Sequence, residues 1–243
     1  MICSFTQTYS NNREELYHFH NKDTTDIYFR NKLDRNYYAF HNSDNEYMSK
    51  ILNSDYLKQM NNKEIIVYRD ISYTESFYKT LQKLKSDGVK YIFFLQDDVF
   101  SMESTEVIDS LMEYVKNNEF DMLNIEKEYI DLKTQPKNII YSNDNLTVYD
   151  TDSNDFKNIG IWSYDDGPYV ARVDYLINNV YDPEYFMKGD IWEAEGYLFN
   201  RISNHKIQRY TTNHSIFRRF VIVGKNPALL RDSELAILNK KFP

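Results

Sequence analysis

Residues 63–99 decide the fold, and they read KEIIVYRDISYTESFYKTLQKLKSDGVKYIFFLQDDV. The runs KEIIVYRD and KYIFFLQ are apolar at their centres and bounded by polar residues, which is typical of strands, and the run of residues 91–95 has the composition of a buried one. The segment between them repeats apolar side chains at helical spacing: Phe77, Leu81 and Leu84. Ser72 or Thr74 is suited to cap this helix, and Gly88 to end it. A strand, a helix and a strand with short connections predict parallel strands joined by a right-handed crossover.

The same alternation continues on both sides of this unit. Downstream, STEVIDSLMEYVKNN predicts a helix over 104–118 and FDMLNIE a strand over 120–126. Upstream, ICSF predicts a short strand at 2–5 with a loop after it. The following segments predict a helix, a strand and a longer helix in turn: 12–21, 25–31 and 46–60.

Beyond about residue 131 the pattern weakens, although short elements are still expected. We expect strands at 138–142 and 146–150, a strand and a helix around the Gly-Pro turn of 159–179, a helix at 189–206, a strand and a loop within 207–221, and a closing helix at 227–241. No stretch has the composition of a linker. The sequence therefore predicts one α/β domain, with a mixed, mostly parallel central sheet flanked by helices.

Composition excludes several classes of protein. The 243 residues carry a net charge of −8, which argues against a nucleic-acid binder that neutralises phosphates with a basic surface. One cysteine rules out an internal disulfide framework and a cysteine-based zinc site. No membrane span and no secretory signal are recognisable. We therefore expect a soluble protein of the cytoplasm, or of the host cytoplasm if the source is a virus.

Two adjacent acids, Asp97 and Asp98, end the apolar run of residues 91–95. In an open α/β sheet, ligands bind beyond the carboxyl ends of the strands. Neighbouring carboxylates repel each other unless a cation or hydrogen-bond donors hold them, and Mg²⁺ or Mn²⁺ prefers such oxygen ligands. The alternative is that the acids cap the helix beginning near Ser104 or face water.

The segment 73–100 resembles the centre of GT-A fold glycosyltransferases, in which an apolar strand ends in a D-x-D motif. The resemblance implies a Rossmann-like fold, a nucleotide-sugar donor and a divalent cation bound to its diphosphate. It places Asp98 at the motif's last acid, the metal ligand. It implies that Gln96 and Asp97 contact the donor, although Gln96 occupies a position where the family has an acid. It further implies a donor-binding half at about 1–100, an acceptor-binding half at about 101–225 and a tail at 226–243.

A second segment, GDIWEAEGYLFNRI at 189–202, resembles the E-D-x-x-L-x-x-R motif of inverting members of that family. Glu195 takes the position of the acid that removes the proton from the acceptor hydroxyl, while Ala194 replaces the motif's first acid. The neighbouring Glu193 and Trp192 are then candidates for substrate binding. The alternative is that these acids only favour a helix N-terminus.

The remaining candidates follow from the same resemblance. Asp165, Asp166 and Gly167 are expected on the acceptor side, unless they form only a polar turn. His214 is a candidate metal ligand or an ordinary structural histidine, and Arg218 and Arg219 are candidates for the donor diphosphate. The donor itself is expected to contact residues near the first three strands: Thr6, Gln7, Tyr9, Arg13 and Asp70.

The sequence thus predicts a metal-dependent glycosyltransferase that moves a sugar, preferably from a UDP-sugar, to a hydroxyl of a glycan, protein or small molecule with inversion. Two alternatives remain. A sugar nucleotidyltransferase also combines an α/β sheet with metal-binding acids, but its usual glycine-rich N-terminal loop is missing from TQTYSNNREEL at 6–16. A nucleotide- or sugar-binding module without catalysis would explain the two altered motif acids.

Overall fold

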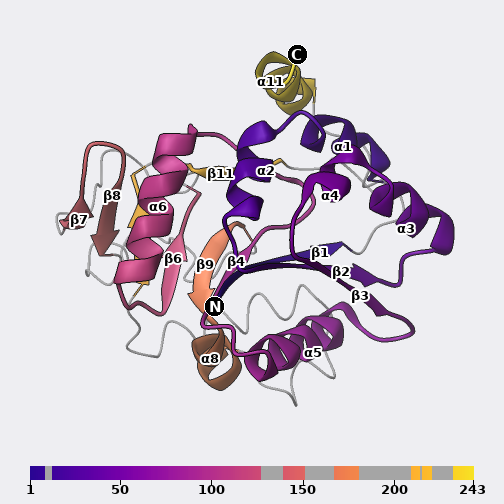
Figure 1. Cartoon of the computed structure of the whole chain (residues 1–243), viewed down its shortest axis with the longest axis horizontal. Helices are drawn as coiled ribbons and strands as arrows, with labels where there is room; N and C mark the ends of the chain where they lie inside the picture. The colour runs from indigo at the N-terminus through magenta and orange to yellow at the C-terminus, as the bar shows by residue number, and fades with distance from the viewer. Residues whose placement is uncertain (9–12, 127–138, 151–166, 181–208, 214, 221–231) are drawn as a thin grey trace.

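A computed structural model describes most of the chain (Figure 1). The described residues are 1–8, 13–126, 139–150, 167–180, 209–213, 215–220 and 232–243. Among them, no helix is both long and apolar enough to cross a membrane.

A nine-stranded sheet in the order β3-β2-β1-β4-β9-β6-β10-β8-β7 forms the centre of the molecule. Its first four strands are parallel: β3 (Lys63–Tyr68), β2 (Arg35–His41), β1 (Ile2–Thr8) and β4 (Tyr91–Phe94). The parallel arrangement predicted from residues 63–99 is therefore confirmed. The crossover from β3 to β4 passes over β2 and β1, which lie between them.

The second half of the sheet is mixed. β9 (Tyr169–Arg172) lies between β4 and β6 (Met122–Asn124) and runs antiparallel to both. β6 therefore points the same way as β4. Beyond it lie β10 (Arg209–Thr212), β8 (Thr147–Asp150) and β7 (Ile139–Ser142). A separate two-stranded sheet joins β5 (Val99–Ser101) to β11 (Phe217–Arg219).

Helices cover both faces of the sheet (Figure 1). On one face lie α1 (Glu14–His20), α2 (Thr24–Asn31), α3 (Asn45–Leu52), α4 (Asp55–Gln59) and α6 (Thr105–Asn117). The other face carries α5 (Tyr73–Ser86) and α8 (Val173–Tyr175), which continues into the π-helical turn η2 (Leu176–Val180). The C-terminal α11 (Asp232–Lys241) lies beyond α1 and α2.

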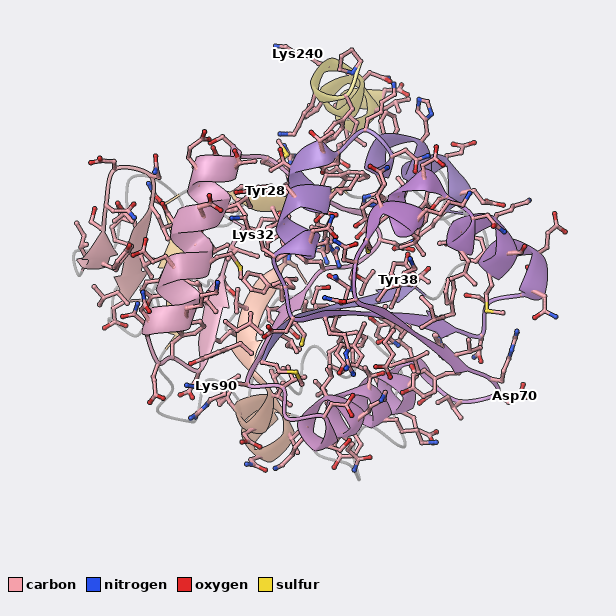
Figure 2. All side chains as sticks on the ribbon, viewed as in Figure 1. Tyr28, Lys32, Tyr38, Asp70, Lys90 and Lys240 are labelled. Atoms are coloured by element: carbon pink, nitrogen blue, oxygen red, sulfur yellow. The ribbon has the colours of Figure 1, made fainter. Side chains whose placement is uncertain are left out.

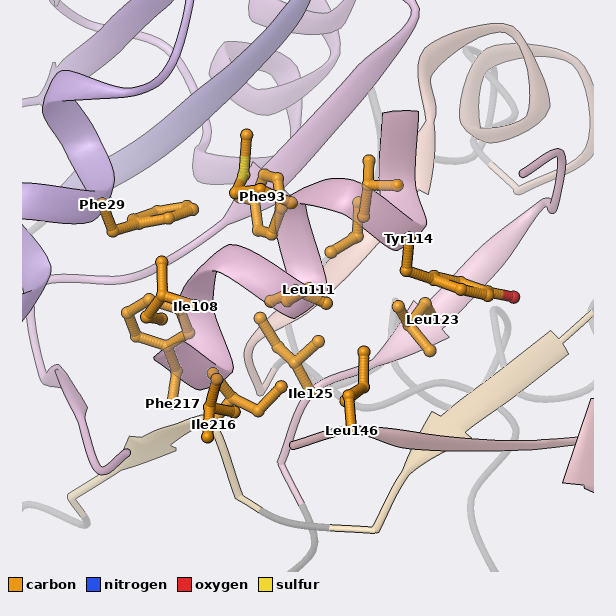
Figure 3. Packing of buried hydrophobic residues seen from close by; sticks show 14 of the residues in the cluster. Phe29, Phe93, Ile108, Leu111, Tyr114, Leu123, Ile125, Leu146, Ile216 and Phe217 are labelled. Atoms are coloured by element: carbon orange, nitrogen blue, oxygen red, sulfur yellow. The ribbon is translucent and has the colours of Figure 1, made fainter. Parts of the chain in front are cut away.

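Alternation along the strands assigns side chains to the two faces. In β1, Cys3 and Phe5 belong to the apolar core under α5, whereas Ser4 and Thr6 contact Arg30 of α2 on the opposite face. A second apolar cluster packs α6 and α2 against β4 and β6, with Phe29, Phe93 and Leu111 at its centre (Figure 3). Apolar cores on both faces explain why the central strands read as continuous apolar runs.

The strand predicted at 25–31 is wrong, because these residues form α2. Asp23 caps the helix by accepting a hydrogen bond from the backbone N–H of Asp26 at 3.0 Å. One turn later, the Asp26 carboxylate pairs with Arg30 at 3.2 Å. These two polar contacts fix a helix in a segment whose apolar residues also fit a strand.

Four other elements differ from the sequence predictions. The strand β2 was not predicted, nor was β5. The single helix expected at 46–60 is two helices, because Ser54 starts α4 by accepting from the backbone N–H of Leu57 at 3.3 Å. β1 continues to Thr8, so Thr6 and Gln7 belong to a strand and not to the loop after it.

The remaining expected elements that fall on described residues are present. Ser72 is the cap of α5, accepting from the backbone N–H of Glu75 at 3.1 Å. Gly88 follows that helix with a φ of 78°, a conformation that glycine adopts readily. The short strands expected beyond residue 131, the strand after the Gly-Pro turn and the C-terminal helix correspond to β7, β8, β9, β10 and α11, whereas β11 is a second strand within 207–221, where one strand and a loop were expected. The helix expected at 189–206 lies outside the described residues.

Candidate functional site at the carboxyl ends of the strands

The acid pair lies in a tight turn directly after β4. The backbone N–H of Val99 donates to the carbonyl of Gln96 at 3.2 Å, so Asp97 and Asp98 are the two central residues of the turn. This turn is at the edge where β1, β2, β3, β4 and β6 all end, the position at which α/β sheets bind ligands. Both acids are nevertheless buried, with exposures of 2% and 5%.

A buried arginine faces the two acids. Arg13, the residue before α1, forms a close ion pair with Asp97, and its Nη1 lies 3.7 Å from Oδ2 of Asp98. The remaining carboxylate oxygens, Oδ2 of Asp97 and Oδ1 of Asp98, make no hydrogen bond with any described residue. Because buried polar atoms usually have partners, two such oxygens on adjacent residues make the turn a candidate ligand site.

The electrostatics of the pair follow from its burial. Burial raises the pKa of Asp98 from 3.8 to about 6, and the charge of Asp97 acts in the same direction. The positive charges of Arg13 and Arg219 lower this pKa but do not cancel the cost of burial. Asp98 is therefore ionised at neutral pH at a cost in stability, which a bound cation would offset.

The backbone of the turn is held from two sides. Nε2 of His20 lies 2.9 Å from the carbonyl oxygen of Asp97, and because a carbonyl only accepts, this nitrogen carries the proton. Burial lowers the pKa of His20, whose ring is stacked between Tyr56 and Phe100. On the other side, the backbone N–H of Phe220 donates to the carbonyl of Asp98 at 2.9 Å.

Pairing of β5 with β11 brings the C-terminal part of the chain to the acids. Arg219 lies opposite Val99 in this pairing, and its backbone N–H donates to Oε1 of Glu126 at 3.0 Å. Glu126 is buried and follows β6, two strands away from β4 in the sheet. Glu126 was not among the predicted site residues, although it follows an apolar strand just as Asp97 and Asp98 do.

Two tyrosines complete the described surroundings of Asp97. Burial, and next the charge of Asp97, raise the pKa of Tyr38 in β2 and of Tyr47 in α3, so both phenols stay neutral. The Tyr47 hydroxyl lies 3.3 Å from Oγ1 of Thr8, whereas the Tyr38 hydroxyl has no hydrogen-bond partner among the described residues. Tyr38 lies on the helix-covered face that carries α1 to α4 (Figure 2). In a chain with 22 tyrosines, nothing in the sequence distinguishes these two.

The residues predicted to bind the donor do not all lie beside the acid pair. Arg13 lies against the acid pair. Thr6 is buried and accepts from Nη1 of Arg30 at 2.8 Å, while Nε2 of Gln7 donates to Oγ of Ser76 at 2.6 Å. Asp70 is exposed after β3, three strands away from β4 and at the outer rim of the molecule (Figure 2). The structure therefore brings Arg13, Gln96, Asp97 and Asp98 together but does not bring Asp70 to them.

Of the residues predicted to contact the acceptor, Gly167 is described, and it is buried just before β9. The carbonyl of the next residue, Pro168, accepts a hydrogen bond from the backbone N–H of Ile125 at 3.3 Å. The remaining predicted residues lie outside the described part of the chain, and their roles stay predictions: Tyr9, Asp165, Asp166, Trp192, Glu193, Glu195 and His214.

The chemistry of the acid pair fits a hard divalent cation. It offers two buried carboxylate oxygens without hydrogen bonds, the type of ligand that Mg²⁺ and Mn²⁺ prefer. Within the described residues, no group of three or more His, Cys, Asp or Glu side chains is placed to hold a metal. A cation at Asp98 would therefore need oxygens from elsewhere, as magnesium sites built from one or two carboxylates and substrate phosphates do.

No family model and no curated protein sequence matches this chain. Solved structures do. TarS 1–349 from S. aureus superimposes with a TM-score of 0.56 at 10% identity, over 89% of this chain and 59% of that one. The 4-diphosphocytidyl-2C-methyl-D-erythritol synthase of Anaerococcus prevotii gives a TM-score of 0.52 at 9% identity, over 99% and 97% of the two chains.

A third structure, described as a putative nucleotide-diphospho-sugar transferase from Desulfovibrio desulfuricans, aligns at 9% identity with a TM-score of 0.45, over 86% of this chain and 78% of that one. The chain spans less than two thirds of the TarS fragment. At these identities the likeness concerns the fold. The chain shares with TarS 1–349 and with the A. prevotii synthase a mixed α/β architecture, with a mostly parallel central sheet flanked by helices.

Proposed function

We propose that this protein is a metal-dependent glycosyltransferase that takes a sugar from a nucleotide-sugar donor, preferably a UDP-sugar, and transfers it to an acceptor hydroxyl. The observation that carries the proposal is the acid pair. Asp97 and Asp98 lie buried at the ligand-binding edge of a nucleotide-sugar transferase fold, each with a carboxylate oxygen that no described residue satisfies.

In this proposal Asp98 holds the cation, and Asp97 lies beside it in the same turn, paired with Arg13 in the absence of ligand. Asp98 would hold a divalent cation there, and such a cation would supply positive charge to the departing nucleotide diphosphate. His20 and the backbone of Phe220 keep the turn in place through the carbonyls of Asp97 and Asp98. Pre-positioned charges of this kind lower the barrier because they need no rearrangement during the reaction.

The proposed general base is Glu195, which removes the proton of the acceptor hydroxyl as its oxygen attacks the anomeric carbon. A base on the face opposite the leaving group leads to inversion, by the same geometry as in inverting glycoside hydrolysis. This assignment rests on the match of residues 194–201 to the inverting motif.

One second function is favoured by a specific observation. The name of the A. prevotii neighbour says that its product carries a diphosphocytidyl group, and the superposition covers nearly the whole of both chains. Nucleotidyl transfer would use the same acid pair and cation but release pyrophosphate. The absence of glycine from residues 6–16 makes glycosyl transfer the better proposal, since nucleotidyltransferases usually carry a glycine-rich loop there.

The test offers purified protein a panel of UDP-sugars with Mn²⁺ and, separately, nucleoside triphosphates with sugar 1-phosphates. We expect release of UDP from the first panel, loss of that release with EDTA, and loss in Asp98→Ala. Asp174→Ala is the matched control, because Asp174 is an exposed carboxylate that pairs with the surface residue Lys85. Release of pyrophosphate from the second panel would favour nucleotidyl transfer. Metal-dependent donor binding with no product of either kind would identify a binding module.

A further inference from the structure

Arg13 offsets part of the negative charge of the acid pair from inside the protein. Its Nη1 contacts Asp97 and lies 3.7 Å from Asp98, so one guanidinium faces both carboxylates. The Arg13 side chain is 4% exposed and that of Asp97 is fully buried, so water does little to screen this contact. Three charges taken out of water are tolerated only when they compensate one another. A flat guanidinium with five donors is well suited to contact two acids at once.

The helix that follows Arg13 also contacts the backbone of the turn that carries Asp97 and Asp98. His20, at the end of the short helix that Arg13 precedes, donates to the carbonyl of Asp97. The start of α1 therefore binds the side chain of Asp97, and the end of α1 binds its main chain. Arg13 is consequently a fixed part of the site, and its charge stays beside the acids when no ligand is present.

A cation that binds the same carboxylates must share them with this guanidinium. The attraction of Asp97 and Asp98 for a divalent ion is reduced by a positive charge already in contact with one of them. A nucleotide diphosphate changes this balance, because its phosphate oxygens accept hydrogen bonds from arginine and also ligate the metal.

We propose that Arg13 is the internal counter-ion of the acid pair and makes binding of the divalent cation depend on the nucleotide diphosphate. Without nucleotide, Arg13 competes with the cation for Asp97 and Asp98. With nucleotide, the diphosphate takes over Arg13 and leaves the carboxylates to the cation. The inference rests on the proposed function, because it assumes that the acid pair is a metal site. It adds a residue that couples cation and donor binding.

The experiment measures Mn²⁺ binding by electron paramagnetic resonance at pH 8, alone and in the presence of UDP. For wild-type protein we expect weak binding of Mn²⁺ alone and at least tenfold tighter binding with UDP. In Arg13→Gln, Mn²⁺ alone should bind at least tenfold more tightly than to wild type, and the effect of UDP should shrink, because coupling between two ligands is reciprocal. Arg13→Gln combined with Asp98→Asn should lose the added affinity.

The matched control is Arg35→Gln, because Arg35 is a half-exposed arginine at the start of β2, the opposite edge of the sheet. Its Mn²⁺ affinity should equal that of wild type. A folded Arg13→Gln protein whose Mn²⁺ affinity is unchanged or weaker overturns the inference.

If Arg13→Gln does not fold, Arg13→Lys takes its place. The lysine ammonium contacts one carboxylate at a time. Mn²⁺ alone should therefore bind to Arg13→Lys at least threefold more tightly than to wild type. An unchanged affinity overturns the inference. Failure of the proposed function looks different. In that case neither wild type nor any variant binds Mn²⁺, with or without UDP, and the inference falls with it.

Discussion

Replacing Asp98 with asparagine should stabilise the protein while it removes the metal site. Asp98 is isosteric with asparagine, its Oδ1 makes no hydrogen bond with a described residue, and its carbonyl contact to Phe220 does not involve the side chain. The substitution therefore removes a buried charge with little change in packing. Functional sites commonly lower the free energy of unfolding in this way.

The magnitude follows from two opposing terms. At 3.7 Å, the attraction between Arg13 and Asp98 is about 4 kcal/mol with an effective dielectric constant of 20. Burial outweighs it, because the pKa of Asp98 is still raised from 3.8 to about 6. A rise of about two pKa units, at about 1.4 kcal/mol each, means that ionised Asp98 destabilises the fold by roughly 3 kcal/mol above pH 6.

The sign of the pH dependence is fixed by the raised pKa. Between pH 3.8 and about 6 the folded protein keeps a proton on Asp98 that the unfolded chain releases, so wild-type stability falls as the pH rises through this window. Asp98→Asn has no such proton. Its advantage in free energy of unfolding should be small at pH 4 and reach roughly 2–3 kcal/mol at pH 8.

Urea unfolding of both proteins without added metal, from pH 4 to pH 8, measures this difference. Asp174→Asn, at an exposed position, serves as the control and should show no comparable trend. The reasoning is refuted if Asp98→Asn is less stable than wild type at pH 8, or if the difference between them does not change with pH.

Three further outcomes are expected. Arg30→Met should lower the free energy of unfolding by about 3–5 kcal/mol in a urea titration, because Arg30 is the buried cation that pairs with Asp26 at 3.2 Å; a loss below 1 kcal/mol would mean that the pair contributes little. Gly88→Ala should cost about 1 kcal/mol, measured as a lower melting temperature, because its φ is 78° while no atom lies within 4 Å of the added methyl group; an unchanged melting temperature would contradict this. Glu195→Gln should keep the affinity for UDP-sugar in calorimetry but lower the turnover rate at least a hundredfold, and unchanged turnover would remove Glu195 from its proposed role.

Much of the sheet could be predicted because its signal is local. The strands at 63–68 and 91–94 are short apolar runs bounded by polar residues, and the helix between them carries its own cap at Ser72. Burial on both faces explains the run of β4, whereas β3 is the outermost strand of the sheet and its residues are exposed or half-buried. The acid pair was predicted for the same reason, since two carboxylates directly after such a run are conspicuous in the sequence alone.

The errors came where contacts distant in the sequence or alternative local contacts decide the structure. Within residues 25–31, the apolar residues Ile27 and Phe29 are two positions apart, which is the spacing expected on one face of a strand. The cap at Asp23 and the ion pair between Asp26 and Arg30 nevertheless favour a helix. Apolar and polar residues do not alternate regularly along β2, because both faces of this strand are buried under helices. Neither feature can be read from apolar periodicity.

The composition of the site was only partly predictable for a related reason. Arg13 and Asp97 are 84 residues apart, and their contact depends on α1 folding back over the end of β4. His20 reaches Asp97 in the same way, and Glu126 reaches the site through the pairing of β5 with β11. Sequence position gives no indication that these side chains meet.

The most direct test of the account is a crystal soaked with Mn²⁺ and a UDP-sugar, examined for the anomalous signal of manganese. We predict one strong peak in contact with the carboxylate of Asp98 and with the diphosphate, and no such peak in crystals of Asp98→Asn treated in the same way. A nucleotide bound elsewhere, or manganese absent from the turn after β4 in the wild-type crystal, would contradict the central claim.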